Sequence, residues 1–224
     1  MPNDIAPVSE TDTGTDYEIR TEEALRDLIG HPSGLAAKKS LPKLDKYCRD
    51  FIALSPFLCI GTMSGDGRAD VSPRGDPAGF VQVLDDNTIA IPDRPGNHRL
   101  DTMSNILANP SVGLIFMIPG FEDTLRINGR ATLTRDPAIL DRAVIKNKRP
   151  EIAIRIQVEE AFLHCAKALK RSRLWEADAQ VDRSVMPSLA RIILNQTSEG
   201  EAIDEATVKT ADERLEESYR KHLY

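Results

Sequence analysis

The chain has 224 residues, of which 41% are hydrophobic and 29% are charged, a balance typical of a folded globular protein. Lys and Arg total 29 against 35 Asp and Glu, and the resulting charge of −6 argues against a broad nucleic-acid-binding surface. The longest apolar runs, 57–60 and 112–118, are far shorter than the roughly 20 residues that span a bilayer. We therefore expect neither a nucleic-acid nor a membrane partner. Residues 1–20 are polar and acidic and resemble no signal peptide, so we expect a cytoplasmic location.

The first predicted elements are an extended arm and two helices. Residues 1–20 show no sustained periodicity and are expected to be an arm. A short helix is predicted over 21–29, with Thr21 as its N-cap and Gly30 as its stop signal. The apolar residues of 40–54 recur at helical spacing and predict a second, amphipathic helix.

From residue 57 the pattern changes to short strands separated by turns. Gly65 and Gly67 favour a tight hairpin turn. Pro73 is expected to end the second strand of this hairpin at residue 72. Helices are predicted over 97–108 and from Asp136 toward Lys148. Strands are predicted over 57–63, 68–72, 80–84, 88–92, 112–118, 124–134 and 152–158. Antiparallel hairpins of this kind indicate a small β-barrel with helices at its ends.

Two helices are predicted after Trp175, over 188–195 and within 201–224. The second has a narrow apolar stripe on a strongly charged background, which is typical of a helix that packs on another surface. That surface is either the barrel of the same chain or a second subunit.

Cysteine and histidine usage predicts no metal site. Cys48, Cys59 and Cys165 lie in apolar-periodic stretches without Cys-x-x-Cys spacing, and we expect them to be reduced core residues. The four histidines are scattered, with no His-x-x-x-His or His-Glu-x-x-His pattern.

Two loops carry the residue types that bind an anion. Asp70–Pro77 places one arginine between prolines and glycine, where the backbone can approach a ligand closely. Ile91–Asp101 places two arginines and an asparagine before a predicted helix, and these groups suit a phosphate. The alternative is that Arg94 and Arg99 form surface ion pairs with Asp93 and Asp101, an arrangement that could account for one of the two arginines but not for both.

Three motifs carry a resemblance to a known family. Ala-Asp-Val-Ser-Pro-Arg-Gly-Asp at 69–76, Arg-Pro-Gly-Asn-His-Arg-Leu-Asp at 94–101 and Leu-Arg-Ile-Asn-Gly-Arg-Ala at 125–131 stand in this order. The chain resembles the pyridoxamine 5′-phosphate oxidase-like FMN-binding split-barrel family over about residues 55–135, and the likeness extends through 164–175. The first two motifs look like a bacterial branch known mostly as FMN-binding proteins without an assigned substrate.

The resemblance implies a mainly β fold with helices, an antiparallel split β-barrel that carries flanking helices and N- and C-terminal helical extensions. It also implies a homodimer with FMN at the subunit interface. Residues 1–54 would be an arm with helices, 55–175 the FMN-binding domain and 176–224 a helical extension that packs on the same domain or on the partner.

The resemblance also assigns the cofactor contacts. Arg94, Asn97 and Arg99 would hold the FMN phosphate. Ser72, Pro73, Arg74 and Gly75 would line the ribityl chain and the flavin edge, with Arg74 tuning the flavin. Lys167, Ser172 and Trp175 would complete the site, and a partner subunit is one source for them.

The expected function is that of an FMN-dependent oxidoreductase with a small-molecule electron donor or acceptor and an unknown substrate. Vitamin B6 oxidation is doubtful, because the full basic and aromatic set that holds the substrate phosphate of the true oxidases is not seen. Two alternatives stay open: a flavin carrier or sensor without turnover, and a barrel that binds haem or a deazaflavin. His98 and His164 would be the first haem ligands to test.

Overall fold

The computed structural model describes residues 17–198 and 200–224, so most of the predicted arm lies outside the described residues. The chain divides into two compact units, with the boundary between Lys38 and Lys39. The first unit holds α1 (Glu22–Ile29) and α2 (Gly34–Lys38). As predicted, the Thr21 side chain caps α1 by accepting a hydrogen bond from the backbone nitrogen of Ala24. The short helix α2 was not predicted.

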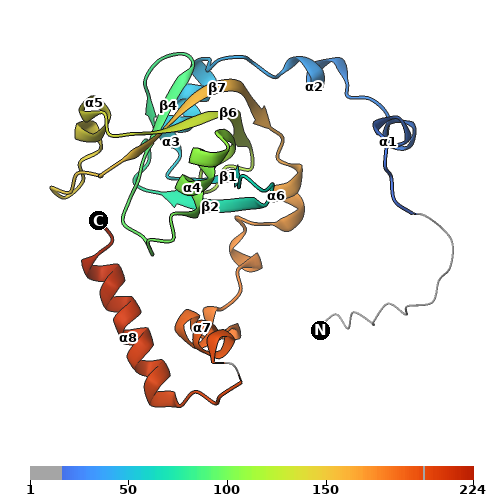
Figure 1. Cartoon of the computed structure of the whole chain (residues 1–224). Helices are drawn as coiled ribbons and strands as arrows, with labels where there is room; N and C mark the ends of the chain where they lie inside the picture. Colours follow the sequence, from blue (N-terminus) through green and yellow to red (C-terminus); the bar gives the residue numbers. More distant parts are fainter. Residues whose placement is uncertain (1–16, 199) are drawn as a thin grey trace. The chain divides into compact units, whose positions relative to one another are not determined.

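The second unit contains a seven-stranded antiparallel sheet in the order β2-β1-β5-β6-β7-β4-β3 (Figure 1). The outer strands β2 and β3 are not paired with each other, so the barrel is split rather than closed. The fold is mainly β with helices, as predicted. Its strands are β1 (Phe57–Met63), β2 (Ala69–Gly75), β3 (Gln82–Val83), β4 (Thr88–Pro92), β5 (Ser111–Met117), β6 (Thr124–Thr134) and β7 (Ala153–His164).

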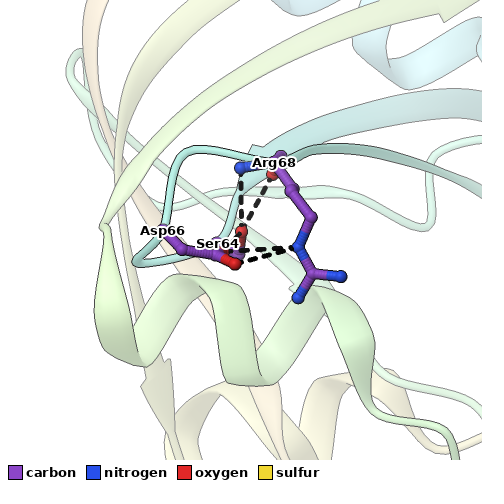
Figure 2. Close-up of polar contacts among 3 residues, drawn as sticks. All are labelled: Ser64, Asp66 and Arg68. Atoms are coloured by element: carbon purple, nitrogen blue, oxygen red, sulfur yellow. Dashed lines mark hydrogen bonds and ion pairs between the residues drawn. The ribbon is translucent and has the colours of Figure 1, made fainter.

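The hairpin between β1 and β2 shows how local sequence sets the register. Ser64, Asp66 and Arg68 hold one another across the turn (Figure 2). The Ser64 hydroxyl accepts a hydrogen bond from the backbone nitrogen of Arg68 at 3.0 Å, and the Arg68 Nε donates to Asp66 at 3.1 Å. Gly67, with φ of 88°, adopts the left-handed conformation that the turn requires. The predicted hairpin is therefore confirmed.

The prediction that Pro73 ends a strand was wrong, because β2 continues through Pro73 to Gly75. β2 is an edge strand, and an edge tolerates a residue that lacks a backbone donor. The last strand is also longer than predicted, since β7 reaches His164. Its pairing with β6 contains a bulge at Asn128 and Gly129. A side chain at Gly129 would lie 2.1 Å from the Gln157 carbonyl oxygen, so the close approach of the two backbones requires glycine.

Three predicted helices have different bounds in the structure. The helix predicted over 40–54 begins later, as α3 (Lys46–Leu54), because Leu41 pairs with Ala161 instead. The helix predicted from residue 97 begins as α4 (Asp101–Ala108), after left-handed backbone at His98 and Leu100. The helix that starts after Asp136 ends early, as α5 (Pro137–Leu140) and the 3-10 turn η1 (Asp141–Ala143).

The main core lies between the sheet and α3. Cys48, Phe51 and Ile52 of α3 pack with buried residues from the strands, and Ile106 of α4 joins the same cluster. All three cysteines are free, as predicted, but only Cys48 is a core residue. The core prediction was wrong for Cys165, which is exposed just after β7 where the strand has left the core; Cys59 is half-buried.

The chain continues after β7 through α6 (Lys167–Ser172) and two 3-10 turns, η2 (Ala177–Ala179) and η3 (Arg183–Val185). The helices α7 (Leu189–Thr197) and α8 (Glu205–Lys221) follow close to their predicted positions and pack against each other. Asp204 caps α8, and Val208 is its buried residue. No helix of residues 17–198 and 200–224 has the length and apolar character needed to cross a membrane.

Candidate functional site

A cavity of about 940 Å³ opens where β2 and β4 end. It is lined by three segments that are separate in the sequence, 70–76, 92–103 and 148–152, together with Phe80 and Tyr224. Its volume falls within the range of about 300 to 1,000 Å³ that is common for small-molecule sites. The sheet thus brings the two predicted Arg-bearing loops to one place.

Seven of the predicted cofactor-binding residues line this cavity, namely Ser72, Pro73, Arg74, Gly75, Arg94, Asn97 and Arg99. Ser72 and Arg74 are partly buried along β2, whereas Asn97 and Arg99 are exposed in the loop before α4. The residues predicted at the phosphate and those predicted at the flavin therefore line one cavity.

The Arg74 guanidinium has one nitrogen in an ion pair and another without a hydrogen-bond partner among the described residues. Its guanidinium Nη1 donates to the Asp93 carboxylate at 2.7 Å, and both side chains are about four-fifths buried, at 17% and 21% exposure. Burial raises the pKa of Asp93, and the positive charge of Arg74 opposes that rise. The Nε of Arg74 is buried and has no hydrogen-bond partner among the described residues. This orphaned donor suits an acceptor atom of a bound ligand.

Arg94 is engaged within the chain. Its Nε donates to Asp76 at 2.6 Å, and its Nη2 donates to the carbonyl oxygen of Ala143 at 2.9 Å. The Asp76 side chain is only 1% exposed and that of Arg94 only 14%. Arg94 therefore supports the cavity wall here, and it would have to exchange these partners to hold a phosphate. The expected partner Asp93 is taken by Arg74 instead.

Arg99 forms a surface ion pair with Asp101, at 2.8 Å, which is the alternative considered to a phosphate contact, and its side chain is 73% exposed. Its hydrogen bond to Asp101 raises the pKa of Arg99, so the guanidinium stays charged. The side-chain amide oxygen of Asn97, Oδ1, accepts a hydrogen bond from the Arg99 backbone nitrogen at 3.1 Å, which fixes the loop. Both side chains face the same cavity.

The N-terminus of α4 completes this wall. Its N-cap position, Leu100, is left-handed with φ of 58° and makes no side-chain cap hydrogen bond. The first-turn residues Asp101, Thr102 and Met103 line the cavity. α6 also has no side-chain cap, whereas α1, α3, α5, α7 and α8 each have a capping side chain. The first-turn amides of α4 are thus left without a side-chain acceptor, as in many anion sites.

The family comparison covers this part of the molecule. The model of the family described as pyridoxamine 5′-phosphate oxidase matches residues 44–165, which is more than half of the chain. The chain belongs to this family. The match includes α3, all seven strands and both Arg-bearing loops. No match was found among curated proteins.

Solved structures related to the pyridoxamine 5′-phosphate oxidase fold are distant. Group A Streptococcus HupZ is 18% identical, with a TM-score of 0.46, and the match covers 54% of this chain and 93% of HupZ. A putative pyridoxamine 5′-phosphate oxidase from Lactobacillus delbrueckii is 19% identical, with a TM-score of 0.44, covering 55% of this chain and 95% of that one. An F420 reductase is 14% identical, with a TM-score of 0.40, covering 53% and 98%.

The other three residues predicted from the family resemblance lie outside the cavity of their own chain. Lys167 and Ser172 are on α6, where the Ser172 hydroxyl donates to the carbonyl oxygen of Leu169 at 3.0 Å. The Trp175 indole nitrogen donates to the carbonyl oxygen of Phe121 at 2.7 Å, which holds this segment against the β5–β6 loop. Their predicted role as cofactor ligands stays a prediction that requires a second subunit.

Sequence reasoning did not assign roles to Asp76 and Tyr224, and it considered Asp93 only as a partner of Arg94, although all three line the cavity. Asp76 ends the first quoted motif, and Asp93 directly precedes the second, so their signal was available. Tyr224 offered no such signal, because its contact with Asp76 joins residues 148 positions apart. Of the two histidines proposed as haem ligands, His98 lines the cavity, whereas His164 ends β7 outside it. The described residues contain no cluster suited to a metal ion.

Proposed function

We propose that this protein binds FMN in the cavity at the ends of β2 and β4 and acts as an FMN-dependent oxidoreductase. The observation that carries the proposal is the convergence of two Arg-bearing loops, 70–76 and 92–103, with the uncapped N-terminus of α4 in one cavity. A flavin mononucleotide needs cationic and amide donors at its phosphate and polar donors at its ring, and this cavity offers both.

The phosphate end of the proposed site is the loop before α4. Among the residues that the structure describes, the Arg99 guanidinium pairs only with the solvent-exposed carboxylate of Asp101, so it is available for a charge-assisted hydrogen bond. Asn97 uses its side-chain oxygen Oδ1 within the loop, which leaves its side-chain amide nitrogen as a donor. The first-turn amides of α4 supply further donors and a partial positive charge.

The flavin end of the proposed site is the edge strand β2. Bound FMN would accept a hydride from a reduced donor and pass electrons to oxygen or an organic acceptor. Arg74 would act on the flavin through its charge, because a cation beside the ring stabilises the reduced anionic form. Its buried, unpartnered Nε would gain an acceptor there. Ser72 would add a hydroxyl donor on the same strand, and Pro73 and Gly75 would let the backbone approach closely.

We further propose that residues 55–175 form the cofactor-binding domain and that the active form is a homodimer. Lys167, Ser172 and Trp175 would then come from the partner's α6 region, because each lies outside the cavity of its own chain. Light scattering of the purified protein tests the dimer. A monomer that still binds FMN with full affinity would contradict the partner contribution.

The function is tested by spectroscopy of the purified protein. Flavin absorption bands, present as isolated or after adding FMN, are expected to bleach when NADH or NADPH is added without oxygen. Air should then restore the bands, and the reoxidation would justify a screen of organic acceptors. A protein that takes up no FMN would overturn the proposal.

Other outcomes of the same experiment separate the alternatives. Tight FMN binding without reduction by any tested donor would indicate a carrier or sensor. A haem band that appears on adding haem, and is lost in His98→Ala, would indicate a haem-binding barrel, because His98 is the candidate haem ligand that lines the cavity. Uptake of a deazaflavin in place of FMN would give a third spectrum.

A further inference from the structure

Tyr224 connects the end of the α8 segment to the candidate cofactor cavity. Its hydroxyl donates to the Asp76 carboxylate at 2.9 Å, and it lines the cavity together with residues of β2 and the loop before α4. In Figure 1 the red helix α8 leads back to the C-terminus beside the split barrel. The same hydrogen bond raises the pKa of the Tyr224 phenol, which keeps it protonated and able to donate.

Both oxygens of the Asp76 carboxylate accept hydrogen bonds, one of them from Tyr224. One oxygen accepts from Tyr224 and the other accepts from Arg94, while the carboxylate itself is almost completely buried. A buried carboxylate needs such partners, because its charge is costly away from water. Tyr224 is therefore one of the two groups that stabilise Asp76 at the cavity wall.

Two cations lie over the Tyr224 ring. The Arg94 guanidinium is 5.5 Å and the Lys146 ammonium is 5.1 Å from the ring centroid, both within the range of cation–π attraction. Lys146 and Asn147 have φ of 48° and 60°, a left-handed turn that non-glycine residues rarely adopt. No carboxylate partner of Lys146 is found among residues 17–198 and 200–224. The ring therefore holds a strained, cation-bearing turn beside the cavity.

We propose that Tyr224 is a positioning residue of the cofactor site, which holds Arg94 and Asp76 at the cavity wall, keeps Lys146 close to that wall and fastens the end of the α8 segment to it. The Tyr224 ring lines the cavity without filling it, because a volume of about 940 Å³ remains with the ring in place. This inference rests on the proposed binding of FMN, whose negative charge the two cations would favour. It adds an element that lies outside the region matched by the family model.

The fastening is tested first without any ligand, by hydrogen–deuterium exchange of the full chain. In Tyr224→Ala, peptides that cover 145–148 and 218–224 are expected to exchange faster than in the wild type, because both segments lose their anchor. Tyr219→Ala is the matched control, since Tyr219 lies exposed on α8 and does not line the cavity. Equal exchange in wild type and Tyr224→Ala would overturn the inference.

The effect on the site is tested by FMN titration of the same proteins. Tyr224→Ala is expected to raise the Kd about tenfold, and Tyr224→Phe about threefold because it keeps the ring over the cations. Tyr219→Ala should leave the Kd unchanged. Unchanged affinity in Tyr224→Ala would overturn the positioning role while FMN binding by the wild type still stood. If the wild type binds no FMN, the proposed function fails, and the exchange measurement still decides the fastening.

Discussion

The two ends of loop 93–100 place the same residue type in opposite surroundings. Arg94 is mostly buried and bound to Asp76 and to the Ala143 carbonyl, whereas Arg99 is exposed and, within residues 17–198 and 200–224, its side chain is bound to Asp101 alone. A buried ion pair is costly to break, while an exposed one contributes little to stability. Arg94 is thus suited to support the cavity, and Arg99 is free to change partners and bind a ligand.

The largest effect that this comparison predicts is on stability. Arg94→Ala would leave the buried Asp76 carboxylate without its cation and should lower the free energy of unfolding by about 3 kcal/mol. Urea denaturation followed by circular dichroism measures the change. Arg99→Ala is the control and should unfold like the wild type. Equal stability of both variants would show that burial does not distinguish the two arginines.

The next effect is on ligand affinity, where we expect Arg99 to matter directly although it matters little for stability. Arg99→Ala should raise the Kd for FMN about tenfold or more, because a charge-assisted hydrogen bond to the phosphate is lost. Arg68→Ala is a matched control, since Arg68 also pairs with an aspartate two positions away and is exposed, but lies outside the cavity. If both variants bind FMN equally, Arg99 is not a phosphate ligand.

A smaller effect is expected on the pH dependence of stability, because of the ion pair between Arg74 and Asp93. Since burial raises the pKa of Asp93, the native state binds its proton at a higher pH than the unfolded chain does. The free energy of unfolding should therefore gain a falling component as the pH rises from about 4 through the native pKa. Asp93→Asn removes that component, which denaturation at several pH values would detect. An identical pH slope in the variant would contradict the assignment.

The smallest expected effect comes from Asp101, whose carboxylate competes with a bound phosphate for Arg99. Asp101→Asn removes the negative partner of Arg99 and should lower the Kd for FMN about twofold, because exposed ion pairs are weak. Isothermal titration calorimetry at low salt gives the best chance of resolving it. A weaker affinity would mean that Asp101 orients Arg99 for the ligand rather than competing with it.

Local patterns predicted most of the fold. The strand 124–134 and the cap at Thr21 follow from residue types that act over a few positions, and both match the structure. The end of β2 could not be predicted, because Pro73 is tolerated only where the strand has a free edge. The start of α4 was misplaced because left-handed backbone at Leu100 is not encoded by a glycine.

The candidate site was predictable where it is built from adjacent residues. Its two Arg-bearing loops carry recognisable motifs, but the pairing of Arg74 with Asp93 and of Arg94 with Asp76 crosses between the loops. Sequence spacing suggested ion pairs between neighbours along the chain only as the alternative to phosphate contacts, and of these the structure contains the pair of Arg99 with Asp101. The position of Tyr224 at the cavity depends on how the whole C-terminal segment folds, and local sequence patterns do not predict that.

The edge position of Pro73 also limits how copies of this protein can associate. A proline in a sheet sits where its missing amide faces away from the ladder, so the outer side of β2 lacks a continuous row of donors. The opposite edge, β3, is only two residues long. Neither edge offers a template for another strand, which guards against aggregation by sheet extension. Any assembly of this chain is therefore expected to use side-chain surfaces, and the cavity-bearing edge stays open to small molecules.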